Sequence, residues 1–155
     1  MAPRDLLAPL QGQRQETLKV LASLSEADLE RVDEESGWSV RAILGHLASA
    51  ELGEAFFIRS AARGDVIHMD AETRDGFNHD SVAKTAGWSL DRLEGELVEA
   101  RETLAEVFGE LSEDDLDRPI RWPEWPARTI RASIPYMLEH EDAHVDQVRH
   151  ALDRD

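Results

Sequence analysis

Residues 90–111 carry an apolar repeat whose spacing alternates between three and four residues. Its members are Leu90, Leu93, Leu97, Ala100, Leu104, Val107 and Leu111. On an α-helix this spacing places all seven side chains on one narrow stripe, as in the seam of an antiparallel bundle or coiled coil. Such a stripe is stable only when other helices cover it, so the sequence predicts helical partners for this segment.

Three further stretches have helical periodicity, and no segment of useful length alternates as a half-buried strand would. They cover residues 4–22, 39–63 and 129–152. Ser39, Ser89 and Thr129 each stand just before an apolar-periodic run, which predicts that they cap the helices that follow. Pro135 lies within the last stretch, so we expect this helix either to kink there or to begin later, near Ser133.

The connections between these four predicted helices differ in length. The longest is the polar stretch 64–87, between the second and third helices. Four helices with one long middle connection predict an all-α four-helix bundle of the up-down-down-up type, with residues 1–155 as one domain. We expect residues 64–87 to form an exposed loop or to cover a site in the bundle. Side chains in this stretch that offer at most an adventitious metal site are His68, Asp70, Asp75 and His79.

The composition excludes several classes of function. The 155 residues include 33 acidic and 17 basic side chains, and the formal net charge of −16 repels nucleic acid and anionic lipid. No apolar run approaches the length of a membrane span, and the N-terminus lacks a hydrophobic signal core, so we expect a cytoplasmic protein. Cysteine is absent, which excludes thiolate metal sites and a cysteine nucleophile.

Three histidines are the candidate metal ligands. His140 and His144 are four residues apart on the fourth predicted helix, so both side chains lie on one face, toward the bundle interior or its rim. His46 lies at the edge of the apolar stripe of the second helix. Three imidazoles between two helices would suit Zn²⁺, Ni²⁺ or Fe²⁺ and leave coordination positions open, as in a catalytic site. The alternative is that these histidines are hydrogen-bonded polar residues of the core.

Residues 140–144 read His-Glu-Asp-Ala-His, which matches the zinc-protease pattern H-E-x-x-H. The extended form of that pattern needs Gly where Gln147 stands, and only 11 residues follow His144, so a protease is disfavoured. Glu141 projects toward the core. It can orient a metal ligand, act as a base on metal-bound water, or pair with a buried arginine.

Two segments resemble the DinB-like superfamily. They are Trp38-Ser-Val-Arg-Ala-Ile-Leu-Gly-His46-Leu-Ala-Ser-Ala-Glu51 and the later His140-Glu-x-x-His144-x-x-Gln147. The helix order and the long middle connection with Phe77-Asn78 agree as well, so the likeness covers nearly the whole chain. The resemblance implies a four-helix bundle, often a homodimer, with a divalent zinc or nickel ion held by His46, His140 and His144.

The resemblance also implies a chemistry. Better-characterised members of this superfamily are S-transferases that use bacillithiol or glutathione, and mycothiol-dependent maleylpyruvate isomerases. We therefore expect a metal-dependent enzyme of the transferase or isomerase type, which brings a low-molecular-weight thiol to an electrophilic small molecule. Glu141 and Gln147 are expected to support the metal ligands. The alternatives are a non-catalytic stress-response module that binds a metal or a small molecule, and a metal-assisted hydrolase with Glu141 as the catalytic base.

The tryptophans have structural interpretations. We expect Trp38 and Trp88, each just ahead of a helix, to plug the end of the bundle. Trp122 and Trp125 lie in a proline-stiffened loop and are the lid candidates. The basic residues that we expect to pair with carboxylates, rather than to hold an anionic substrate, are Arg41, Arg59 and Arg131.

Overall fold

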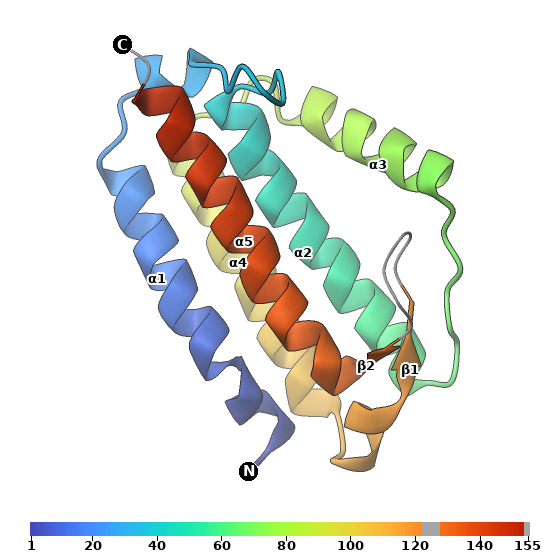
Figure 1. Cartoon of the computed structure of the whole chain (residues 1–155). Helices are drawn as coiled ribbons and strands as arrows, with labels where there is room; N and C mark the ends of the chain where they lie inside the picture. The colour runs from blue at the N-terminus through green and yellow to red at the C-terminus, as the bar shows by residue number, and fades with distance from the viewer. Residues whose placement is uncertain (122–127, 154–155) are drawn as a thin grey trace.

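The computed structural model describes residues 1–121 and 128–153. Four long helices lie side by side and form the predicted bundle (Figure 1). Their bounds are α1 Ala8–Ala22, α2 Val40–Ala62, α4 Leu90–Glu110 and α5 Ile130–Leu152. Helices α1 and α5 run in one direction and α2 and α4 in the other, so the all-α fold class and the up-down-down-up order are confirmed.

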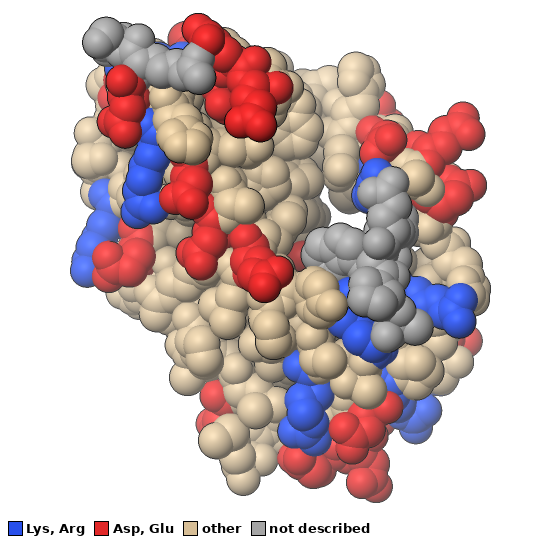
Figure 2. Space-filling model, viewed as in Figure 1, with Lys and Arg blue, Asp and Glu red and all other residues tan. Residues whose placement is uncertain are grey.

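Short elements connect the long helices. The 3-10 turns are η1 Pro3–Leu7, η2 Ala27–Glu30 and η3 Asp114–Asp117. After η3, strand β1 (Pro119–Ile120) pairs in antiparallel fashion with β2 (Arg128–Thr129), directly before α5. Acidic side chains form several patches on the face seen in Figure 2. Across the described residues, no helix combines the length and the apolar character that crossing a membrane requires.

Residues 64–87 contain a helix that the apolar pattern does not predict. Helix α3 (Ala71–Lys84) lies beside α2, and it begins after Asp70, whose carboxylate accepts a hydrogen bond from the Thr73 backbone N–H at 2.7 Å. Its one buried residue is Ser81, so no apolar stripe marks it in the sequence. The segment carries the chain from the end of α2 back to the start of α4, which lets these two helices run parallel (Figure 1).

The three predicted helix caps are confirmed. The side-chain oxygens of Ser39, Ser89 and Thr129 accept hydrogen bonds from the backbone N–H three residues later, at 3.1 to 3.2 Å. The cap at Thr129 makes α5 begin at Ile130, so the expected start near Ser133 is wrong. Pro135 lies inside α5, where it removes only the hydrogen bond to a carbonyl of the first turn, and the helix therefore tolerates it.

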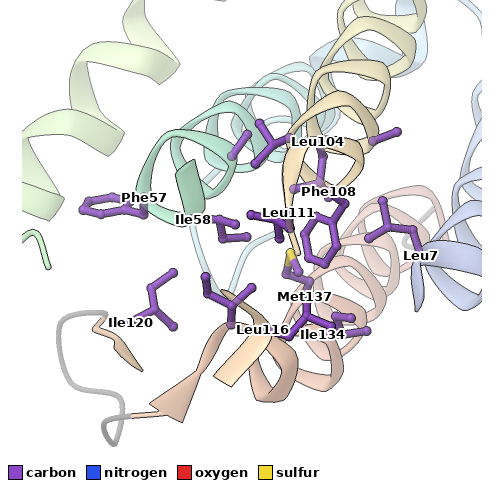
Figure 3. Close-up of a cluster of buried hydrophobic side chains, with 14 of the residues drawn as sticks. Leu7, Phe57, Ile58, Leu104, Phe108, Leu111, Leu116, Ile120, Ile134 and Met137 are labelled. Atoms are coloured by element: carbon purple, nitrogen blue, oxygen red, sulfur yellow. The ribbon is translucent and has the colours of Figure 1, made fainter. Parts of the chain in front are cut away.

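The apolar core is divided into two clusters along the bundle. The first cluster surrounds Phe108, with Leu104, Leu111 and Met137 beside it (Figure 3). The second is built from the start of α2 and α4 and the end of α5, and includes Ile43, Leu93, Leu97, Val148 and Ala151. A layer of buried charged residues lies between the two clusters, formed by Arg14, Glu51, Arg101 and Glu141.

Replacing Gly45 by alanine is expected to lower the free energy of unfolding by about 1–3 kcal/mol through overpacking. A Cβ at Gly45 would lie 2.6 Å from Thr85 Cγ2, at the buried C-terminal end of α3. Gly53, two turns later on α2, has open space at the same position and gives the matched control. Gly53→Ala is expected to be neutral or to stabilise by up to about 1 kcal/mol. Urea unfolding measures both variants, and equal stability would contradict the close contact of α2 with α3.

Candidate metal centre

Three histidine side chains meet between α2 and α5. His46 comes from the first half of α2, while His140 and His144 are one turn apart on α5, which packs against α2. The Nε2 atom of His140 lies 3.2 Å from Nε2 of His46 and 3.1 Å from Nε2 of His144. One ring nitrogen of each histidine lies within 4.8 Å of the other two. These three residues are called the histidine triad below.

Hydrogen bonds between the rings do not account for this geometry. A ring nitrogen carries either one hydrogen or one lone pair, in the plane of the ring. The Nε2 atom of His140 therefore cannot make two good hydrogen bonds, although it approaches two other rings. Ligands of one metal ion, with metal–nitrogen bonds of about 2.0–2.1 Å, have nitrogens about 3.0–3.4 Å apart. The triad therefore fits a divalent transition metal such as zinc, nickel or iron.

Burial keeps the triad uncharged. His46 is 6% exposed, and burial, together with the neighbouring His144 and His140, lowers its pKa to about 3. Burial is also the main reason why the pKa of His140 is lowered to about 4 and that of His144 is lowered. Neutral imidazole is the form that binds metals, so the ring nitrogens can act as lone-pair donors at neutral pH.

Two neighbours orient the rings of the triad. The Nδ1 of His144 donates a hydrogen bond to Oε1 of Gln147 at 2.6 Å, because an amide oxygen can only accept. This leaves the lone pair of His144 on Nε2, which faces the other histidines. The indole of Trp38 stacks on His144 with ring planes 8° apart and meets His46 edge-on. Gln147 thus supports a triad residue as expected.

The two described tryptophans pack as expected, and one of them does more. Trp38 and Trp88 both lie against the second apolar cluster, which agrees with their predicted role as plugs at the end of the bundle. Trp38 also contacts the rings of His144 and His46 and lines the cavity beside the triad. Trp122 and Trp125, the lid candidates, lie outside the described residues.

Glu141 takes part in a buried ion-pair network with α1 and α4. Its carboxylate accepts hydrogen bonds from Arg14 at 2.9 and 3.0 Å, from Arg101 at 3.0 Å and from Thr17 Oγ1 at 2.6 Å. Glu51 of α2 completes the network, 3.1 Å from Arg14 and 2.8 Å from Arg101. Burial opposes ionisation of Glu141, but hydrogen bonds and charges from the arginines outweigh it and lower its pKa. The structure therefore shows pairing with buried arginine, one of the three roles expected for Glu141.

A cavity of about 980 Å³ opens beside the triad, between α2, α5 and α3. The molecule is visibly hollowed in this region in Figure 2. The triad and Trp38 form one part of the lining, and much of the remainder is apolar. The apolar residues are Leu52, Phe56, Phe57, Ile67, Met69 and Phe77. Phe77 belongs to α3, so residues 64–87 cover a site in the bundle, the second of the two roles expected for them.

The other candidate ligands do not form a second metal site. Within residues 1–121 and 128–153, the histidine triad is the one group of three or more metal-ligating side chains. His68 and His79 therefore remain outside any such group, as do Asp70 and Asp75. Asp70 instead caps α3.

The arginines singled out in the sequence pair with carboxylates, as expected. The pairs are Arg41–Glu30, Arg59–Glu110 at 2.8 Å and Arg131–Glu113 at 3.0 Å.

Four buried charged residues within the long helices were not predicted, although the sequence carries a signal for them. Arg14 falls between Leu10 and Thr17 at spacings of four and three, which is a position of the buried stripe of α1. Glu51 and Glu54 fall in the same way between Leu47 and Ile58 on α2, and Arg101 follows the buried Ala100 on α4. A charge at a position of an apolar repeat must find a buried partner or remain neutral, so these positions mark polar sites inside the bundle.

Comparisons with known proteins agree with the resemblance found in the sequence. The DinB superfamily matches residues 10–148. The uncharacterized protein YuaE of Bacillus subtilis (strain 168) is 25% identical over 146 residues, a match that covers 88% of this chain and 90% of YuaE.

Among solved structures, the mycothiol-dependent maleylpyruvate isomerase is similar, with a TM-score of 0.80 and 13% identity. A histidine-to-alanine mutant of that isomerase gives a TM-score of 0.79 and 12% identity. Both matches cover 96% of this chain but only 61% of the isomerase chain. This likeness supports the fold.

Proposed function

This chain belongs to the DinB superfamily, and on that premise we propose that it is a metal-dependent enzyme that transfers or adds a small thiol to an electrophilic molecule. The observation that carries the proposal is the histidine triad, three neutral imidazoles that meet at one part of a cavity large enough for a small molecule. The fold also resembles that of an isomerase named for its dependence on mycothiol, which supports a thiol as the cosubstrate.

Each residue of the site has a defined part in this proposal. His46, His140 and His144 would hold the metal, which supplies thiol activation because it lowers the pKa of a thiol at an open position. The chain has no cysteine, so the thiol comes from the cosubstrate. Gln147 fixes the tautomer of His144, and Trp38 stacks on the ring of His144. The apolar part of the cavity receives the electrophile.

A hydrolase with Glu141 as base is not part of this proposal. Both carboxylate oxygens of Glu141 accept hydrogen bonds from buried arginines, on the side of α5 that faces α1 and α4. A carboxylate held in this way is a poor base, because the arginines stabilise its ionised form and lower its pKa.

Metal-loaded protein is expected to catalyse many turnovers of thiol conjugation. Protein loaded with zinc, nickel or iron would be mixed with glutathione, bacillithiol or mycothiol and with 1-chloro-2,4-dinitrobenzene. Formation of the carbon–sulfur bond releases chloride and gives a product that absorbs light. His144→Ala should reduce the rate to background, whereas His79→Ala, an exposed change on α3, should not change it. Binding of thiol without turnover would instead support the non-catalytic binding module.

The same premise supports a homodimer. Sedimentation of the purified protein tests the dimer directly, because a dimer has twice the mass of the chain.

A further inference from the structure

Glu54 is a buried carboxyl group that lines the cavity beside the triad. It lies on α2 eight residues after His46 and is 7% exposed. Within the part of the chain that the structure describes, it has no hydrogen bond or ion-pair partner. A side chain that is more than nine-tenths buried, unpartnered and exposed only to a cavity is suited to contact a ligand there.

The charges of the buried ion-pair network are balanced without Glu54. Arg14 and Arg101 neutralise Glu51 and Glu141 in the ion-pair network. Burial and the negative charge of Glu51 raise the pKa of Glu54 to about 8, although Arg101 and Arg14 oppose this. At neutral pH the group is therefore a carboxylic acid, which can donate a hydrogen bond.

Other charged groups face the same space. Arg128 of β2 interacts electrostatically with Glu54, and its guanidinium group lies 4.0 Å from the ring centre of Tyr136. The charged residues of α3 that line the cavity are Arg74, Asp75, Asp80 and Lys84.

The lining of the cavity around Glu54 is largely apolar. Three large apolar side chains of its lining are left exposed to solvent, namely Leu52 at 39%, Phe56 at 63% and Phe77 at 45%. Exposed apolar groups gathered around one cavity mark a binding site for an apolar molecule. In this lining Glu54 is a polar group without a partner of its own.

We propose that this cavity binds an elongated apolar electrophile with a hydrogen-bond acceptor, such as a carbonyl, at the end remote from the reacting carbon, and that Glu54 donates a hydrogen bond to that acceptor. Eight residues on α2 separate Glu54 from His46, about 12 Å along the helix, so the ligand must be long enough to reach both. That this ligand is the substrate rests on the proposed function. Binding of the ligand in the cavity does not require the metal.

The test is a binding measurement with an unreactive probe, 4-phenylbutan-2-one, which has an aryl group and a ketone. Calorimetry or NMR titration on metal-free protein at pH 7 is expected to show binding. Glu54→Gln retains a neutral donor and should bind within about 3-fold of the wild type, whereas Glu54→Met lacks the donor and should bind about 5–10-fold more weakly. Glu102→Gln, an exposed change on α4, is the matched control.

The pH dependence provides a second readout. Affinity of the wild type should fall between pH 7 and 9, as Glu54 loses its proton, while affinity of Glu54→Gln should stay constant over this range. Any one of three results overturns the inference. These are no binding of the probe to the wild type, binding to Glu54→Met as tight as to the wild type, and loss of binding in Glu54→Gln. Failure of the chain to bind a metal would contradict the proposed function and leave this test unaffected.

Discussion

Glu141→Met is expected to lower the free energy of unfolding by about 3–5 kcal/mol, which is a large share of the about 5–15 kcal/mol that stabilises an ordinary domain. Methionine approximates the volume of glutamate but removes the oxygens that accept hydrogen bonds from Arg14, Arg101 and Thr17. Both arginines are buried, so they lose a counter-charge without gaining water in exchange. Glu51 remains, but one carboxylate cannot neutralise two guanidinium groups.

Urea unfolding followed by circular dichroism measures the effect. Glu139→Met is the matched control, since Glu139 lies on the same helix and is exposed, and a change within about 0.5 kcal/mol is expected for it. Metal content per folded chain should be unchanged in Glu141→Met, because Glu141 contacts α1 and α4 rather than the triad. An unfolding free energy equal to that of the wild type would show that Glu51 alone satisfies both arginines.

The apolar repeats predicted the four long helices because such a repeat arises where one face of a helix is buried against its neighbours. The repeat of residues 90–111 is visible because α2 and the other helices cover one face of α4 along its length. Helix α3 has no such repeat, since it packs on α2 through few buried groups and faces the cavity and solvent elsewhere. Asp70 caps its N-terminus and Thr85, at its C-terminal end, lies close to Gly45, and neither feature produces a periodic pattern in the sequence.

The site was only partly predictable for a similar reason. The spacing of His140 and His144 places two imidazoles on one helix face without knowledge of the fold. The cavity depends on where α3 lies relative to α2, which is a property of the tertiary structure. The apolar lining and Glu54 therefore could not be assigned to a site, although the position of Glu54 in an apolar repeat marks it as unusual.

His46→Ala is expected to reduce bound metal from about one equivalent per chain to less than about 0.1. Mutation of a residue that only hydrogen-bonds to a metal ligand lowers the metal affinity roughly 10–100-fold. Removal of a residue that binds the metal directly is expected to lower the affinity further. His46 is also the triad member on α2, so without it a metal no longer links α2 to α5 and no longer stabilises the fold. Elemental mass spectrometry after loading and dialysis, together with the melting temperature with and without metal, measures both effects.

Acid is expected to release the metal from the wild type only below about pH 5. Protons compete for an ordinary histidine near its pKa of about 6.5. Burial lowers the pKa of His46 to about 3 and that of His140 to about 4, so the lone pairs stay available to lower pH. His79→Ala, on the exposed face of α3, should keep the full metal content. Full metal content in His46→Ala would place the metal outside the triad. Release from the wild type near pH 6.5 would indicate histidine ligands with an ordinary pKa instead of the buried triad.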